Sequence, residues 1–135
     1  MKTHKGGWFG LLLLALTALP GCQSSVVQEF PLTRFKAETM LDQGIRQYDD
    51  GSYKTAARTI QGALDAGLTT RSQARAHKYL AFMYCIADQQ SQCRDEFRKA
   101  LEIDPKLELK PEEEGHPMWA PVFHSVKASM PKTSS

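Results

Sequence analysis

The side chains of this chain that could do chemistry are three cysteines, four histidines and a run of three glutamates. A metal site built from histidine and cysteine needs ligands one helical turn apart or a Cys-x-x-Cys pair. His77, His116 and His124 have neither spacing, with one another or with the cysteines. The sequence therefore predicts no metal site, and it offers no motif for another cofactor.

The three glutamates, Glu112, Glu113 and Glu114, stand between prolines. Catalytic carboxylates work in pairs within a pocket that separates their pKa values, and adjacent carboxylates beside prolines are typical of a solvated segment. No serine of the chain lies in a nucleophile motif. We therefore expect the protein not to be an enzyme.

Cys22 has the most informative surroundings. It ends the stretch Leu19-Pro20-Gly21-Cys22, which follows an apolar run and a basic start with Lys2 and Lys5. A basic start, an apolar stretch and small residues at its end are the layout of a secretory signal. The apolar stretch is about a dozen residues long, which is too short to span a bilayer as a helix.

The stretch Leu19-Pro20-Gly21-Cys22 resembles the lipobox of bacterial lipoproteins. In that family the signal is removed before the cysteine, which carries lipid on its sulfur and an acyl group on its new amine. The resemblance implies a signal peptide over residues 1–21 and a lipidated Cys22, and Gln23, in place of Asp, implies the outer membrane. Two or three acyl chains give durable anchoring. The alternative is a soluble secreted protein with a spare cysteine.

The net charge excludes some partners. The full chain has 17 basic and 15 acidic residues, and removal of the signal with Lys2 and Lys5 leaves 15 of each. A nucleic-acid-binding protein needs a basic footprint, and a polybasic segment would be needed for electrostatic membrane binding. We expect neither.

Apolar residues at helical spacing begin at Thr33 and predict a first helix that ends at Asp49-Asp50-Gly51-Ser52. Ser52 is a predicted N-cap of a second helix, and Gly67 suits the left-handed cap at its end. These two helices are joined by a short turn, which favours an antiparallel pair.

A third and a fourth helix follow the same pattern. Thr69 or Thr70 is predicted to begin the third helix, Ser91 to cap the fourth and Pro105 to end it. No stretch alternates with period two for long enough to predict a strand. The sequence therefore predicts an all-α fold.

An internal repeat relates the two halves. The residues Gly44, Ala56, Ile60 and Ala63 recur 37 positions later as Ala81, Cys93, Phe97 and Ala100. Small residues facing each other let two helix backbones approach closely, and a large apolar residue one turn later fills the space beside them. This is the packing expected of a helical hairpin.

The stretch RAHKYLAFMYCIADQQSQCRDEFRKALEIDP resembles a tetratricopeptide repeat, with matches at Leu80, Ala81, Tyr84, Cys93, Phe97, Ala100 and Pro105. The first repeat matches at Gly44, Tyr48, Gly51, Tyr53, Ala56 and Ala63. It lacks the closing proline and is about three residues longer than the family's usual period. The resemblance covers residues 37–106 and implies a two-repeat domain over 33–106, made of two antiparallel helical hairpins. An unrelated four-helix bundle is the alternative.

Shorter segments flank this domain. Residues 22–32 are predicted to be the lipidated cysteine and a tether, and the nine residues 23–31 reach about 30 Å when fully extended. Residues 107–130, with prolines at 111, 117 and 121, predict an extended strap and a short capping helix near 119–129. Residues 131–135 are predicted to be a disordered tail.

In the tetratricopeptide arrangement Cys85 lies near the end of one helix and Cys93 near the start of its partner. An oxidising periplasm favours a disulfide between them. The alternative is two buried small hydrophobic residues.

The same resemblance implies a concave groove for a partner, lined by Glu38, Leu41, Ile45, Tyr48, Asp49, Arg75, Lys78 and Phe82. An apolar strip with a charged rim suits a bound peptide or helix. The alternative is that the chain itself fills this groove with Phe30, Phe35, or the helix of Trp119 and Phe123.

Taken together, the chain resembles pilotins of type IV pili and accessory lipoproteins of secretion systems, type VI included. We expect an adaptor or scaffold, anchored by lipid at Cys22 to the periplasmic face of the outer membrane, that binds a protein of an envelope assembly. Two alternatives stay open. One is a chaperone-like factor that escorts an outer-membrane or secreted subunit, and the other is a structural lipoprotein that assembles with itself.

Overall fold

The computed structural model describes residues 30–131. The predicted signal peptide 1–21, the predicted lipidation site Cys22, residues 23–29 of the predicted tether and residues 132–135 of the predicted tail lie outside the described residues.

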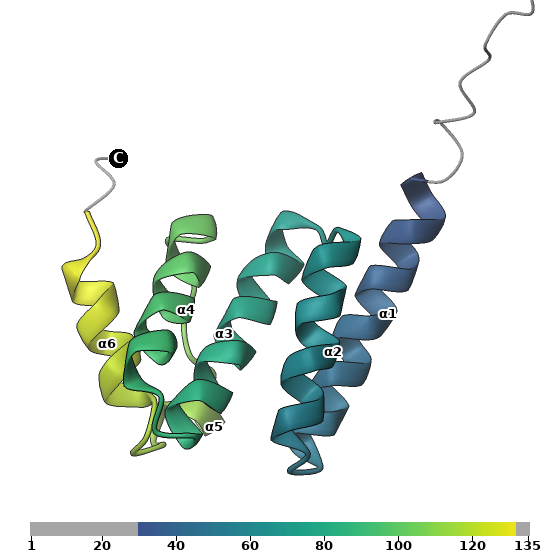
Figure 1. Cartoon of the computed structure of the whole chain (residues 1–135). Helices are drawn as coiled ribbons and strands as arrows, with labels where there is room; N and C mark the ends of the chain where they lie inside the picture. The colour runs from purple at the N-terminus through teal and green to yellow at the C-terminus, as the bar shows by residue number, and fades with distance from the viewer. Residues whose placement is uncertain (1–29, 132–135) are drawn as a thin grey trace, which may run out of the picture.

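Residues 30–131 fold entirely from helices and turns, without a strand, as the sequence predicts. The helices are α1 (Phe30–Asp49), α2 (Tyr53–Ala66), α3 (Thr70–Ile86), α4 (Gln90–Ile103), α5 (Pro111–Glu114) and α6 (Ala120–Ser129). Figure 1 shows α1, α2, α3, α4 and α6 side by side in chain order, with α5 below α3. The first turn of α1 and the last turn of α6 lie at the same edge of this row, and the α1–α2 turn lies at the opposite edge.

The ends of the first helices follow from local residue types. Gly51 has a φ of 78° and Gly67 one of 96°, and glycine adopts this left-handed conformation without steric cost. Thr69 caps α3, because its hydroxyl accepts a hydrogen bond from the backbone N–H of Ser72 at 3.3 Å. The predicted breaks at Gly51 and Gly67 are therefore present.

Two predicted helix starts are wrong. α1 begins at Phe30, three residues before Thr33, because the first helical turn tolerates Pro31, whose missing N–H has no intrahelical partner there. α4 begins at Gln90 with Gln89 as its N-cap, so Ser91 does not cap it. Asp88, at a φ of 58°, has already reversed the chain at that point.

The helices pair as hairpins, α1 with α2 and α3 with α4. At the first hairpin, a Cβ atom on Gly44 would lie 2.4 Å from Cγ1 of Ile60, so only glycine fits there. Both sets of repeated residues are buried, which confirms the hairpin packing that their spacing predicts: Gly44, Ala56, Ile60, Ala63, Ala81, Cys93, Phe97 and Ala100.

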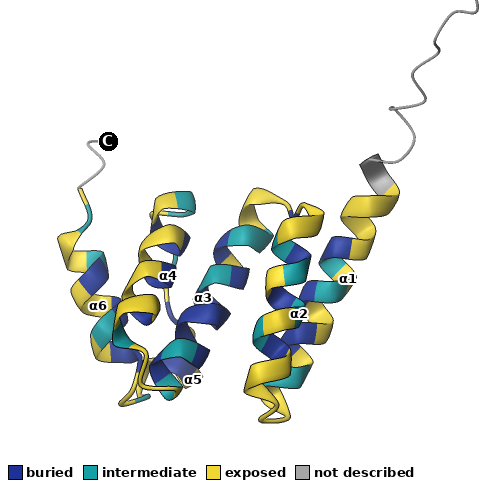
Figure 2. Ribbon diagram, in the orientation of Figure 1, coloured by how far each residue is buried: buried dark blue, intermediate teal, exposed yellow. Residues whose placement is uncertain are grey.

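α3 is the centre of the core. More than half of its side chains are buried, because α2 and α4 cover its two sides and the C-terminal segment covers a third (Figure 2). In the C-terminal segment, residues 107–130, the extended part is shorter than predicted, because Pro111 begins the one-turn helix α5. The predicted capping helix is α6, which packs on α4.

Candidate functional site

The predicted groove residues lie on α1 and α3, but half of them are not at the surface. Leu41, Ile45, Lys78 and Phe82 are buried. The other four keep some exposure: Glu38 and Tyr48 are half-buried, and Asp49 and Arg75 are exposed. The structure therefore brings these eight residues onto two facing helices and closes most of the space between them.

Polar contacts join the two helices near the first turn of α3. The Glu38 carboxylate accepts hydrogen bonds from the Thr69 backbone N–H at 3.1 Å and from the Ser72 hydroxyl at 2.5 Å. Burial raises the pKa of Glu38, but these hydrogen bonds outweigh it and leave the pKa below its usual value. One turn further on, Arg75 pairs with Asp42 at 3.2 Å. Glu38 and Arg75 thus already have intramolecular partners.

Aromatic rings fill the middle of the predicted groove. The Tyr48 ring lies 5.2 Å from that of Tyr79, in an edge-to-face arrangement, and 5.5 Å from that of Tyr53. Desolvation by this packing raises the pKa of Tyr48, so its hydroxyl stays protonated at any physiological pH. Tyr48 acts here as a packing residue that joins α1, α2 and α3.

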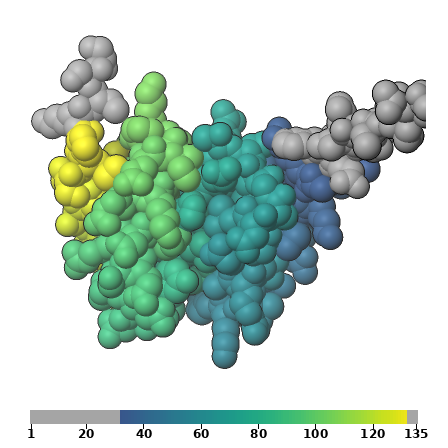
Figure 3. Space-filling model, turned by 45° about the horizontal axis from the view of Figure 1, so that its top comes forward, coloured from purple at the N-terminus to yellow at the C-terminus, as the bar shows by residue number. Residues whose placement is uncertain are grey.

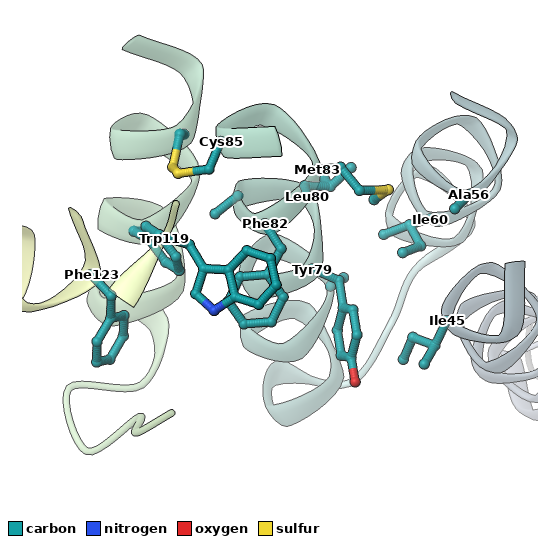
Figure 4. Packing of buried hydrophobic residues seen from close by; sticks show 14 of the residues in the cluster. Ile45, Ala56, Ile60, Tyr79, Leu80, Phe82, Met83, Cys85, Trp119 and Phe123 are labelled. Carbon is teal, nitrogen blue, oxygen red and sulfur yellow. A yellow bond between two sulfur atoms is a disulfide. The ribbon is translucent and has the colours of Figure 1, made fainter. Parts of the chain in front are cut away.

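The C-terminal segment covers the part of the predicted groove that lies on α3. The indole of Trp119 stacks on the Phe82 ring with centroids 4.5 Å apart, as Figure 4 shows. The Lys78 ammonium pairs with the Glu113 carboxylate, at 2.7 and 3.1 Å from its two oxygens. Trp119 Nε1 in turn donates to the Glu113 backbone carbonyl at 3.0 Å. The chain therefore fills its own groove at Lys78 and Phe82, which is the alternative that named Trp119. No partner can reach these two side chains in this structure.

Two further expectations are corrected by the same contacts. Glu113 is buried and paired, so the glutamate run is solvated only at Glu112 and Glu114. Phe35, a second candidate for filling the groove, is 73% exposed. The burial of Glu113 could not be expected from its neighbours in the sequence. Its partner Lys78, like the partner Phe82 of Trp119, is 35 or more residues away along the chain.

The cysteine and histidine side chains are held within the fold. Cys85 and Cys93 form the predicted disulfide, with Cα atoms 5.2 Å apart, and both are fully buried. His77 Nδ1 lies 2.6 Å from a Glu96 carboxylate oxygen, and Lys99 contacts the other oxygen of Glu96. Among residues 30–131, no three side chains of a metal-ligating type are grouped to hold an ion.

An open hollow lies elsewhere, between α2, the second half of α3 and the residue before α4. It has a volume of about 500 Å³ and its walls are Tyr53, Lys54, Ala57, Arg58, Met83, Tyr84, Ala87 and Gln89. Figure 3 shows the surface indented between the parts that belong to α2 and α4. The sequence does not indicate this hollow, because the tetratricopeptide resemblance implies a partner only on the first helix of each repeat.

The hollow combines an apolar surface with positive charge. Tyr53, in the wall of the hollow, is 39% exposed. Lys54 and Arg58 stand on exposed positions of α2, and neither is in an ion pair within residues 30–131. An apolar floor with unpaired cations at its rim can hold a segment that carries an apolar side chain and a carboxylate.

Within residues 30–131, none of the helices has the length and apolar character needed to cross a membrane. Comparisons with protein-family models, with curated proteins and with solved structures found no match for this chain.

Proposed function

We propose that the protein is a lipid-anchored adaptor that binds one protein partner of a bacterial cell-envelope assembly, such as a pilus or a secretion system. Cys22 carries the lipid, and the domain faces the periplasm from the outer membrane. The lipobox-like stretch before Cys22 supports the anchor, and the repeated hairpins support a tetratricopeptide-like binding domain. The proposal includes no catalysis, no cofactor other than the lipid, and no nucleic acid.

The observation that carries the binding role is the hollow beside α2 and α3. Its wall holds two tyrosines and the unpaired cations Lys54 and Arg58. Tyrosine and arginine are the residue types that dominate the energy of protein interfaces. We therefore place the partner here, in preference to the groove on α1 and α3, where Trp119 and Glu113 cover Phe82 and Lys78.

A second hollow is less suited to a partner. It lies between α4 and the end of α6 and includes Arg98, Lys127 and Pro131. Both of its cations have intramolecular partners, because Arg98 pairs with Asp95 and Lys127 with Glu108. Its wall also ends at Pro131, the last described residue.

The proposed site lies at the opposite edge of the molecule from the first turn of α1 (Figure 1). Tyr53 begins α2 and Ala87 follows α3, so the hollow is at the edge of the molecule that carries the α1–α2 turn. The first turn of α1, which follows the anchor along the chain, is at the opposite edge (Figure 1). A partner in the periplasm can therefore reach the hollow while the lipid holds the other edge.

Crosslinked purification from native envelopes tests this function. The variant Lys54→Glu/Arg58→Glu reverses both rim charges and leaves the fold intact, because both side chains are exposed. The matched control Arg71→Glu/Lys106→Glu reverses two exposed charges away from the hollow. We expect the rim variant to lose a partner that the wild type and the control retain.

A partner set that is identical for all three proteins would contradict the placement of the site. Recovery of no stoichiometric partner with the wild type would contradict the adaptor function itself. Circular dichroism of the rim variant must match the wild type for either comparison to be valid.

A further inference from the structure

Residues 32–36 of α1 carry an exposed apolar face. Leu32 and Phe35 are both 73% exposed, and no other large apolar side chain among residues 32–131 comes near this value. They are three positions apart in a helix, so they share one face. The intervening and flanking residues Thr33, Arg34 and Lys36 are exposed as well.

This part of α1 extends beyond the hairpin. α1 has 20 residues and its partner α2 has 14, so α1 is longer by about 9 Å at a rise of 1.5 Å per residue. From Leu32 onward, the first buried residue of α1 is Ala37, and Figure 2 colours the part of α1 directly before it as exposed. The fold of residues 30–131 therefore leaves Leu32 and Phe35 largely uncovered.

The chain before α1 decides what can cover them. Only seven residues, 23–29, separate Cys22 from Phe30. Even fully extended, the ten residues from Cys22 to Leu32 reach no more than about 35 Å. A lipid on Cys22 would therefore keep these turns beside the bilayer at a high effective concentration.

We propose that the first two turns of α1 lie in the membrane interface, with Leu32 and Phe35 inserted among the lipid chains. This inference rests on the proposed lipid anchor at Cys22. Exposed Arg34 and Lys36 flank the two apolar side chains, and residues 30–37 contain no acidic residue. Long cationic side chains beside an inserted apolar face reach the phosphate level, so this composition fits a phospholipid surface.

The contact has a consequence for the proposed partner site. A helix held at its first turns by the bilayer and at Cys22 by lipid cannot turn freely about a single tether. α1 is about 30 Å long, so the α1–α2 turn and the neighbouring hollow lie at the opposite end of this helix from the contact. The contact would thus leave the hollow open to the periplasm.

Fluorescence quenching in vesicles tests the contact. The mature full-length protein with Phe35→Trp is reconstituted in phospholipid vesicles with and without brominated acyl chains. We expect brominated lipid to quench the added tryptophan and its emission to shift to the blue. The wild type supplies the background of Trp119, which is 6% exposed and should not be quenched. The variant Gln92→Trp, at an exposed position of α4, is the matched control and should stay unquenched.

Mass spectrometry of the same sample separates the two proposals. An acylated protein whose Phe35→Trp signal is unaffected by brominated lipid overturns the membrane contact and leaves the anchor in place. A mature protein without acyl mass overturns the anchor and this inference with it. As a second check, Leu32→Ser/Phe35→Ser should unfold at the wild-type temperature in solution. A loss of stability typical of core substitutions would mean that protein covers these side chains, which also overturns the contact.

Discussion

Gly44 shows how a single residue sets the distance between α1 and α2. A methyl group there would lie 2.4 Å from Ile60, a β-branched side chain that is fully buried and cannot move aside. We expect Gly44→Ala to lower the free energy of unfolding by about 1–3 kcal/mol, the usual cost of overpacking. Urea denaturation followed by circular dichroism measures this.

The matched control is Gly62→Ala in α2. Its added Cβ would lie 3.0 Å from the flexible end of Met40, which can shift by a few tenths of an ångström. Alanine also favours a helix over glycine by up to about 1 kcal/mol. Equal destabilisation by both substitutions would contradict the role assigned to the Gly44–Ile60 contact.

Glu96 makes the stability of the fold dependent on pH. Burial raises the pKa of Glu96, but hydrogen bonds from His77 and Lys99 outweigh it and hold the pKa below its usual value of 4.5. A carboxylate with a lowered pKa in the folded state stabilises the protein above its unfolded-state pKa, and the stabilisation is lost as pH falls through the folded-state pKa. Wild type should therefore unfold at a higher temperature than Glu96→Gln at neutral pH, and the difference should shrink as the pH falls below the usual carboxyl pKa of 4.5. A difference that is constant with pH would contradict this account.

The residues that sequence reasoning located correctly are those whose partners are close along the chain. Gly51 and Gly67 mark turns by their own conformation, and the 37-residue repeat marks the small residues between paired helices. Whether the groove is open or filled by the chain itself could not be predicted in this way. Lys78 and Glu113 are 35 positions apart, and neither residue shows in the sequence that it will be buried with the other. The open hollow was missed for the same reason, since Tyr53 and Tyr84 come from different hairpins.

At the scale of elements, the buried pair of Lys78 and Glu113 fixes the C-terminal segment to α3. Removal of one partner leaves an uncompensated charge in a buried place, which costs about 3–5 kcal/mol. We expect Lys78→Met to lower the free energy of unfolding by about this amount, and Lys78→Met/Glu113→Leu to recover most of it. Urea denaturation of both single variants and the double variant completes the cycle. A double variant no more stable than Lys78→Met would contradict a direct interaction between the two side chains.

The disulfide joins α3 to α4 at the end of their hairpin. Cys85 and Cys93 are eight positions apart, and closing so short a loop stabilises a fold by about 2–3 kcal/mol in the chain-entropy model. We expect a reducing agent to lower the free energy of unfolding of the wild type by about this amount. The variant Cys85→Ala/Cys93→Ala should have the same stability with and without the reductant. If reduction leaves the wild type unchanged, the cysteines contribute only as buried apolar residues.

At the scale of the whole molecule, the two hairpins need the C-terminal segment to complete their core. Phe82 is covered by Trp119, and Phe97 lies against Phe123 with ring centroids 5.3 Å apart. Two repeats alone are fewer than the three or so that such arrays usually need for stability. α5 and α6 therefore act as the missing layer, and this is why the groove on α3 is closed.

We expect a chain that ends at Lys106 to lose cooperative thermal unfolding or to self-associate, because truncation would expose the Phe82 and Phe97 rings together with the unpaired Lys78. Calorimetry and light scattering of the truncated protein measure these outcomes. The control chain ends at Pro131, which keeps every described residue, and it should behave as the wild type does. A monomeric chain ending at Lys106 that unfolds at the wild-type temperature would show that the two hairpins are stable by themselves. The segment from 107 onward would then be a removable cover of the groove, and the predicted binding surface on α1 and α3 would again be available to a partner.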